Sequence, residues 1–285
     1  MTPRLFVLGA GRAGRALAHA MRVANVPVVG LHGRRPAVDT TSGELPPSLA
    51  TATIVLVTVR DAELNSALLE LAHARLAPGA VVLHASGGME PAALDTLRAM
   101  GHPGGTFHPL LPLTDPTRAT QQLRSAWIGV DGDDAARAAS RELAAALGAR
   151  VLEIPTGAKA RYHAAAVIAS NFPVVLLSLA SRLLTASGVD ADAARGALTT
   201  LLGAAAENLR AHEPSAALTG PVGRGDVDTV RAHLAALAES PELAGIYRAL
   251  SREALPLAAA AGADPVRLEL VRRALDEGRG PLSAS

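Results

Sequence analysis

The chain has 285 residues, of which 49% are hydrophobic and 19% are charged, a composition that supports a buried core and excludes wholesale disorder. Lys and Arg together number 27 against 26 Asp and Glu, and aromatic residues make up only 2%. This balance argues against a nucleic-acid-binding protein, which needs clustered positive charge and stacking side chains. The absence of cysteine excludes disulfides, thiolate catalysis and cysteine-ligated metals. No metal site is predicted.

The first half of the chain alternates between strand and helix patterns. The predicted strands are 4–9, 27–31, 53–59, 80–85, 104–107, 126–130 and 150–154. The predicted helices between them are 11–24, 62–75, 91–100 and 134–147. Most of the strands are continuous apolar runs, which is typical of a parallel sheet covered by helices on both faces.

The second half is rich in Ala and Leu and carries only helix signals. The predicted helices are 157–187, 191–211, 227–239, 241–261 and 265–277, and Asp190 and Asp226 stand where N-caps belong. We therefore expect an α/β fold with two domains. A doubly wound parallel sheet of the Rossmann type occupies 1–155, and an all-helical domain occupies 156–285.

One uncharged run, 164–181, reaches the lower length limit of a membrane-spanning helix. It contains Asn171, Pro173 and three serines, so a buried helix in a soluble, dimeric protein is the better interpretation. The apolar start of the chain is interrupted by Arg12 and Arg15, too early for a signal peptide. We expect a cytoplasmic protein that does not bind membranes.

The first strand runs directly into Gly9-Ala10-Gly11-Arg12-Ala13-Gly14, a G-x-G-x-x-G pattern that opens a helix. In this setting the first glycine allows a tight turn, the second lets the backbone approach a pyrophosphate, and the third lets helix and strand pack closely. The helix N-terminus then attracts the anion. The six residues therefore predict a dinucleotide site, the alternative being a glycine-rich turn without a ligand.

The end of the second strand predicts which dinucleotide is bound. NAD-binding enzymes place an acid there for the ribose hydroxyls, whereas this chain has Arg34 and Arg35 and no acid nearby. An arginine can hold a 2′-phosphate with charge-assisted hydrogen bonds. The pair favours NADP(H), with a solvated pair of arginines as the alternative.

Three further loops follow predicted strands and should border the same ligand, because ligands of open α/β sheets bind beyond the carboxyl ends of strands. Val59, Arg60 and Asp61 are candidate cofactor residues. His84, Ser86, Gly87 and His108 are candidate substrate residues. Each histidine could bind a carboxylate, relay a proton or be structural, and Ser86 could simply cap a helix.

Lys159 is the only lysine in the chain. Unlike an arginine, a lysine can release a proton, and burial lowers its pKa. His163 and Ser170 share its helical face, and Asn171 lies near that face. The hydride chemistry of a reductase needs a cation or proton donor for the developing alkoxide. We therefore predict Lys159, His163 and Asn171 as catalytic and Ser170 as substrate-binding; the alternative is a hydrogen-bonded interface.

A polar interruption of the helical half, 218–226, contains Arg224. Its guanidinium could bind a substrate carboxylate, and the segment could equally be an ordinary turn that ends in the Asp226 cap.

Taken together, these motifs resemble those of Rossmann-like proteins that carry a DUF2520 C-terminal domain. The resemblance rests on the glycine loop 8–14, His84-Ala-Ser-Gly87, Phe107-His-Pro-Leu110, the segment 159–165, Ser170-Asn171, and 218–226. It implies a Rossmann domain followed by a helical domain similar to that of 6-phosphogluconate dehydrogenase, usually dimeric through the helical part. Relatives of that wider fold include β-hydroxyacid dehydrogenases, ketopantoate reductases and pyrroline-5-carboxylate reductases.

By the same resemblance, Lys159 matches the general-acid lysine of the hydroxyacid enzymes, and His163 stands where those enzymes often have asparagine. The expected function is an NADP(H)-dependent oxidoreductase acting on a small 2-oxo acid, with ketopantoate as the best guess. An imine reductase and a non-catalytic NADP-sensing protein are the alternatives. An iminium already carries positive charge, which a neighbouring ammonium would repel.

Overall fold

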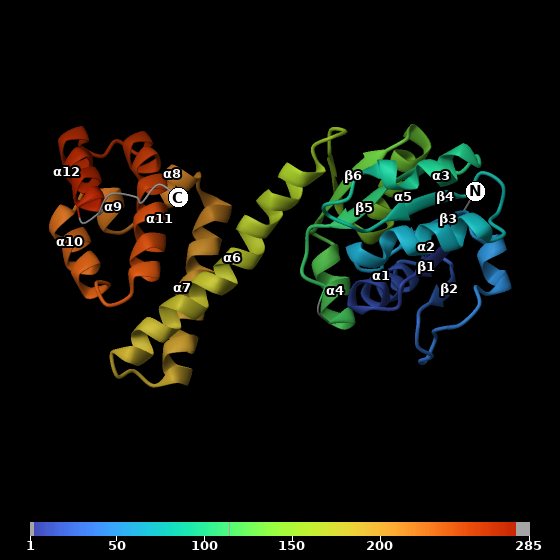
Figure 1. Cartoon of the computed structure of the whole chain (residues 1–285), viewed down its shortest axis with the longest axis horizontal. Helices are drawn as coiled ribbons and strands as arrows, with labels where there is room; N and C mark the ends of the chain where they lie inside the picture. Colours follow the sequence, from blue (N-terminus) through green and yellow to red (C-terminus); the bar gives the residue numbers. More distant parts are fainter. Residues whose placement is uncertain (1–2, 114, 278–285) are drawn as a thin grey trace, which may run out of the picture. The chain divides into compact units, whose positions relative to one another are not determined.

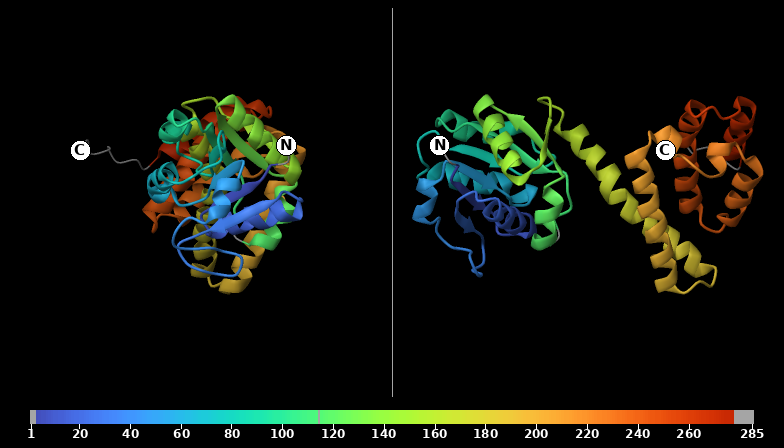
Figure 2. Two further views of the ribbon diagram at one scale, coloured as in Figure 1. Left: turned by 90° about the vertical axis from the view of Figure 1, so that its right-hand side faces the viewer. Right: turned by 180° about the vertical axis from the view of Figure 1, so that it is seen from behind.

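The computed structural model describes residues 3–113 and 115–277, which form two compact units. The boundary between the units lies between Phe172 and Pro173, inside the long helix α6 (Lys159–Ala186). Composition alone places the boundary earlier, at 155/156, where the strand signals end. Pro173 lies inside α6, which Figure 2 draws in yellow-green. The first turns of this helix therefore belong to the unit that contains the sheet.

The first unit contains a single seven-stranded sheet of order β2-β1-β3-β4-β5-β6-β7 (Figure 1). Every strand predicted from the sequence is present. The bounds are β1 Leu5–Leu8, β2 Val28–His32, β3 Ile54–Val57, β4 Val81–His84, β5 Gly104–Pro109, β6 Trp127–Gly132 and β7 Arg150–Glu153. The chain reverses its direction of winding at β1, so β2 and β3 lie on opposite sides of it. A strand order that reverses in this way creates the crevice in which α/β proteins bind ligands.

The sheet departs from the expected parallel arrangement at one edge. Strands β1 to β5 are parallel, but β6 pairs antiparallel with β5, and β7 runs parallel to β6. The connection between β5 and β6 contains a helix that the sequence analysis missed, α4 (Pro116–Leu123), which packs against α1 (Arg12–Val23). Because α4 joins the α1 layer instead of crossing the sheet, the chain re-enters the sheet in the opposite direction.

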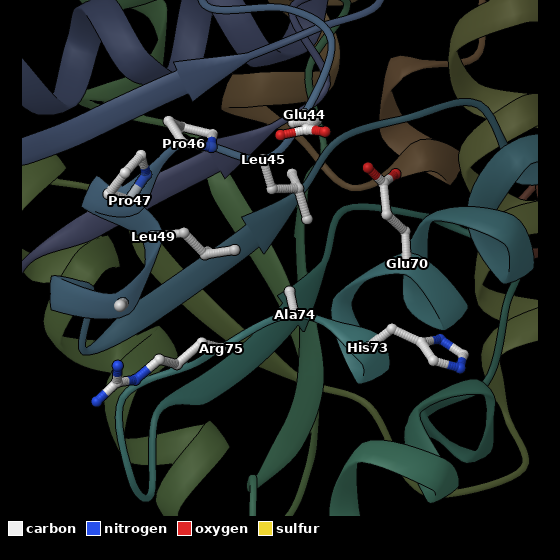
Figure 3. A pocket seen from close by; sticks show the side chains of 10 residues that line it. Glu44, Leu45, Pro46, Pro47, Leu49, Glu70, His73, Ala74 and Arg75 are labelled. Carbon is white, nitrogen blue, oxygen red and sulfur yellow. The ribbon is translucent and has the colours of Figure 1, made fainter.

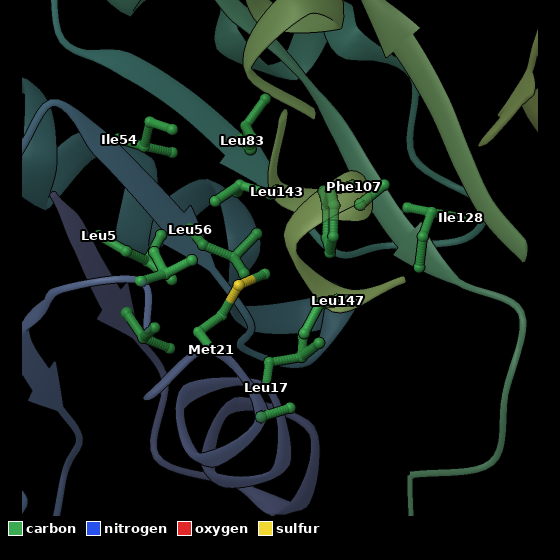
Figure 4. Packing of buried hydrophobic residues seen from close by; sticks show 14 of the residues in the cluster. Leu5, Leu17, Met21, Ile54, Leu56, Leu83, Phe107, Ile128, Leu143 and Leu147 are labelled. Carbon is green, nitrogen blue, oxygen red and sulfur yellow. The ribbon is translucent and has the colours of Figure 1, made fainter. Parts of the chain in front are cut away.

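Both faces of the sheet are covered, and alternate strand residues serve the two cores. Leu5 and Val7 of β1 pack in a cluster with α1 and with α5 (Asp134–Leu147), shown in Figure 4. Phe6 and Leu8 join a second cluster on the other face, formed with α2 (Asp61–His73). The remaining short helices of this unit are η1 Pro47–Thr51, η2 Pro91–Leu94 and α3 Asp95–Ala99. Burial on both faces explains why these strands are apolar throughout.

The second unit is helical throughout its described residues, as predicted. Its helices beyond α6 are α7 Ala191–Ala211, α8 Pro214–Ala217, α9 Pro221–Arg224, α10 Val227–Ala236, α11 Pro241–Ala260 and α12 Pro265–Asp276. The side chains of Asp190 and Asp226 accept hydrogen bonds from backbone N–H groups at the starts of α7 and α10, so both predicted N-caps are confirmed. The short helix α9 lies in the segment 218–226 that was predicted to interrupt the helices, and α8 lies just before it.

Candidate functional site

The glycine loop between β1 and α1 has the geometry that its sequence predicts. Gly9 adopts φ +116°, and a Cβ on it would lie 2.8 Å from the backbone of Thr58. A Cβ on Gly14 would collide with the carbonyl oxygen of Gly9, so helix and strand can approach closely only without a side chain there. Gly11 differs, since a Cβ there would meet nothing within 4 Å. The open space before α1 is where an anion could approach the first N–H groups of the helix.

A cavity of about 920 Å³ lies beyond the carboxyl ends of β1, β2 and β3, at the reversal of strand order. Of the predicted cofactor residues, the cavity is lined by Gly9, Ala10, Gly11, Arg34, Arg35, Val59 and Arg60. The lining does not include Arg12, Ala13, Gly14 or Asp61. Lining residues that the sequence analysis did not single out include Arg15, His32, Thr58, Glu63 and Ser66. The cavity and its glycine loop fit an elongated dinucleotide.

One expectation about this cavity is wrong: an acid does lie near the arginines. A single oxygen of Glu63 in α2 is 2.7 Å from a guanidinium nitrogen of Arg34 and 2.5 Å from one of Arg60. The hydrogen bond from Arg60 is the main reason that the pKa of Glu63 is lowered. The residues at the end of the second strand include no acid, but Glu63 reaches the arginines from the first turn of the later helix α2.

A second group of polar side chains surrounds Lys159, at the start of α6. Lys159 is fully buried (0% exposed), and its Nζ donates a hydrogen bond to the carbonyl oxygen of Ser86 at 3.0 Å. Its backbone N–H donates to Glu90 at 3.0 Å. The ammonium also lies 5.1 Å from the centre of the Tyr162 ring, within range of a cation–π interaction.

Burial is the largest influence on this lysine and lowers its pKa to about 8, although the negative charges of Asp131 and Glu90 oppose that effect. The ammonium is therefore the main form at neutral pH, but it can release its proton under mildly alkaline conditions. The only lysine of the chain thus lies in a buried site, where its pKa is lowered. Its catalytic role stays a prediction.

The imidazoles of His108 and His163 lie together above Gly87, with ring centres 6.1 Å apart. A Cβ at Gly87 would lie 2.9 Å from Nε2 of His108 and would collide with Nδ1 of His163. The other nitrogen of His108, Nδ1, is 2.6 Å from the Tyr162 hydroxyl. A glycine at position 87 is therefore what lets both rings approach the loop after β4.

His84, the last residue of β4, is completely buried, and neither of its ring nitrogens has a partner among the described residues. Burial, followed by the positive charge of Lys159, lowers its pKa to about 4. The same two causes lower the pKa of His108 to about 3. Both imidazoles are consequently neutral at physiological pH.

The structure thus brings together six of the predicted residues, which come from β4 and the loop after it, from β5 and from the start of α6: His84, Ser86, Gly87, His108, Lys159 and His163. The hydroxyl of Ser86 accepts a hydrogen bond from the backbone of Met89 within the loop, and the N-cap of η2 is Glu90, so Ser86 does not cap that helix. Ser170 and Asn171 lie farther along α6 and are exposed, and Arg224 is exposed in the second unit. The roles proposed for these three residues stay predictions.

Sequence reasoning missed Tyr162 and Glu90 in this group. Tyr162 follows Lys159 by three residues and therefore shares its helical face, a signal that could have identified it. Glu90 could not have been found in the same way, because it comes from the loop after β4 and meets α6 only in the folded chain.

Another cavity, of about 600 Å³, lies between η1 and the C-terminal end of α2 (Figure 3). None of the predicted site residues line it. Glu70 borders both cavities. This second cavity is not lined by the glycine loop or by the residues around Lys159.

The comparisons with known proteins agree with the family resemblance. Residues 126–254 match the family described as a domain of unknown function, DUF2520. No protein of curated function matches the chain. The match begins at β6 and ends in α11, so it includes the Lys159 segment as well as most of the helical unit.

Several solved structures share the fold over nearly the whole chain. Protein TM1727 from Thermotoga maritima is 23% identical, with a TM-score of 0.70 over 90% of this chain and 99% of that one. An imine reductase from Myxococcus stipitatus in complex with NADP+ is 18% identical, with a TM-score of 0.61 over 95% and 99%. Pyrroline carboxylate reductase from Plasmodium falciparum, with NADP bound, is 12% identical, with a TM-score of 0.61 over 94% and 98%. These likenesses define the class of fold, a Rossmann-type sheet followed by a helical unit.

The buried state of His84 predicts a specific loss of stability in acid. Its pKa is about 4 in the folded chain against an ordinary value of 6.5, so the unfolded chain binds more protons between these values. Stability contributed by the neutral ring is lost as pH falls from 6.5 to 4, by about 3 kcal/mol. In His84→Leu this loss should be absent, which urea unfolding at a series of pH values will measure.

The matched control is His19→Leu, which removes an imidazole from an exposed position of α1. Parallel curves of unfolding free energy against pH for wild type and His84→Leu would contradict the assignment of a buried neutral ring.

Proposed function

We propose that the protein is an NADP(H)-dependent reductase of small 2-oxo acids, with ketopantoate as the first substrate to test. The observation that carries the proposal is the fully buried ammonium of Lys159, bonded to the loop after β4. That loop follows a strand next to β3, at the same sheet edge as the cavity beside the glycine loop. Reduction of a ketone builds negative charge on oxygen, and a preorganised cation nearby stabilises it.

Different residues that line the large cavity would bind different parts of a dinucleotide. The glycine loop and the N-terminus of α1 would hold the pyrophosphate, and Arg34 and Arg35 would hold the 2′-phosphate. When bound, NADPH would supply a hydride. Two of the similar structures contain NADP or NADP+, which supports the choice of cofactor.

Within the first unit, Lys159 would place its positive charge beside the reacting oxygen, and His108 and His163 would orient the substrate. Ser170 and Asn171, farther along α6, would contribute contacts to the substrate carboxylate. The neutral state of His84 and His108 leaves Lys159 as the main positive charge beside them. A ketone benefits from that charge, whereas an iminium would be repelled by it.

An imine reductase is the second candidate, because two of the proteins with the same fold are a pyrroline carboxylate reductase and an imine reductase. A non-catalytic NADP sensor is the third. Oxidation of NADPH, measured against a panel of 2-oxo acids and cyclic imines, separates the three: turnover with oxo acids supports the proposal, turnover with imines alone overturns it, and tight NADPH binding without turnover favours the sensor.

Replacement of Lys159 by alanine should lower turnover by about 10²–10⁴ while leaving NADPH affinity unchanged, because the ammonium acts on the reacting oxygen and lies outside the cavity lining. Wild-type turnover should also fall as pH rises through about 8, where the ammonium loses its proton. Steady-state kinetics and fluorescence titration with NADPH provide both measurements. Turnover of the variant equal to that of wild type would reject the role of Lys159.

The cofactor assignment predicts an effect confined to the phosphorylated dinucleotide. The double variant Arg34→Ser/Arg35→Ser should bind NADPH about ten- to a hundredfold more weakly, because it removes the donors for the 2′-phosphate. Its affinity for NADH should change little. Arg22→Ser, an exposed arginine at the far end of α1, is the matched control. Equal weakening toward both dinucleotides would contradict the assignment.

We also propose that the protein is a homodimer, in which the partner covers the apolar surface of α6. Ile168, Phe172 and Val174 are 61%, 51% and 67% exposed in the single chain. Large apolar side chains this exposed along one helix mark an interaction surface. By length and composition α6 could also cross a membrane, but Asn171, Pro173 and the serines within it favour a protein partner.

Light scattering on the purified chain should therefore report twice the monomer mass. Val174→Glu should shift it toward the monomer, because a charge at the covered face would be buried without a partner. The control is Val38→Glu, at an 85% exposed position of the first unit. A monomer that sediments with lipid vesicles would overturn the dimer in favour of membrane binding.

A further inference from the structure

The chain has two tyrosines, and each contacts the Nδ1 atom of a histidine. The Tyr162 hydroxyl is 2.6 Å from His108, inside the cluster around Lys159. The Tyr247 hydroxyl is 2.9 Å from His233, in the second unit. The rings of both pairs meet edge to face, at 84° and 85°. The second pair is thus a natural control for the first.

The surroundings of Tyr162 hold its hydroxyl in place. Its ring lies against the ammonium of Lys159, and its hydroxyl occupies the space that a Cβ on Gly129 would fill. Burial raises the pKa of this phenol, so the hydroxyl keeps its proton. A partly buried hydroxyl proton is stabilised by an acceptor, and Nδ1 of His108 lies 2.6 Å away, the distance of a strong hydrogen bond.

That contact determines the state of His108. A neutral imidazole carries one N–H group, and an Nδ1 that accepts from Tyr162 leaves the proton on Nε2. Nε2 is the nitrogen that faces Gly87, next to Nδ1 of His163. The latter atom is buried and has no hydrogen-bond partner among the described residues. One fixed donor and one unpartnered nitrogen therefore lie side by side.

We propose that Tyr162 is a positioning residue that fixes His108 as a hydrogen-bond donor at Nε2, and that His108 and His163 together hold one oxygen atom of the substrate. The donor selects a substrate atom that accepts a hydrogen bond, such as a carbonyl or carboxylate oxygen, and disfavours the N–H of an iminium. The identity of the held atom rests on the proposed function, whereas the tautomer of His108 does not.

The tautomer is directly measurable by long-range proton–nitrogen NMR of the full chain labelled with ¹⁵N-histidine, with His108→Gln to assign the signals. Wild type should show the Nε2–H form of His108. Tyr162→Phe keeps the ring against Lys159 but removes the hydroxyl, so the Nδ1–H form should become populated. Tyr247→Phe should alter the signals of His233 and leave those of His108 unchanged.

An Nδ1–H form in wild type would overturn the positioning role, and so would an unchanged tautomer in Tyr162→Phe. If Tyr162→Phe disturbed the fold as a whole, the nitrogen signals of the other histidines would shift as well. The positioning role can hold even if no 2-oxo acid supports NADPH oxidation, and in that outcome only the proposed function fails.

Pyruvate, as a simple 2-oxo acid, tests the oxygen site in the presence of NADP+. It should shift the nitrogen signals of His108 and His163 in wild type. Its affinity should fall about tenfold in Tyr162→Phe, which corresponds to one hydrogen bond, and stay at the wild-type value in Tyr247→Phe. Pyruvate binding that leaves both histidine signals unmoved, or no binding of pyruvate at all, would overturn the oxygen site.

Discussion

The hydrogen bond from the Lys159 ammonium to the Ser86 carbonyl joins the start of α6 to the loop after β4. A fully buried ammonium is costly unless polar atoms surround it. Here a backbone carbonyl, the face of the Tyr162 ring and the nearby charges of Asp131 and Glu90 provide that surrounding. This single interaction sets the electrostatic conditions for the other groups of the site.

The ammonium reinforces the neutral state that burial gives to the neighbouring histidines. Burial alone disfavours a charged imidazole, and the ammonium adds repulsion, so His84 and His108 both have strongly lowered pKa values. A neutral His108 can accept a hydrogen bond at one nitrogen while it donates at the other. The Tyr162 hydroxyl contacts Nδ1 of His108, and the missing side chain of Gly87 leaves room beside Nε2 of the same ring. The cluster combines one cation with several neutral, directional groups.

The cavity beside the glycine loop follows a different electrostatic design. Arg34 and Arg60 are exposed and share one oxygen of Glu63. The two guanidinium groups place positive charge beside the cavity, and the carboxylate of Glu63 neutralises part of that charge. An incoming phosphate would compete with Glu63 for the same guanidinium groups. Glu63 therefore already occupies the guanidinium groups that an anion in this cavity would contact.

Much of the fold was determined by the sequence alone, because the responsible forces are local. Apolar runs predicted all seven strands, and Asp190 and Asp226 were recognised as caps because a cap acts within its own turn. The glycine loop was predicted from the sequence because its geometry also depends on neighbouring residues. The only lysine was identified as a candidate site residue because, unlike the arginines of the chain, it can release a proton.

Tertiary structure decided what depends on contacts between distant segments. The direction of β6 followed from the packing of α4 on α1, which no local pattern records. Glu63 reaches Arg34 from a later helix, and Tyr162 of α6 contacts His108 of β5. Sequence periodicity placed Lys159 and Ser170 on one helical face, but only folding buried the first and left the second exposed. A helix face is a local property, whereas burial depends on which other segments cover it.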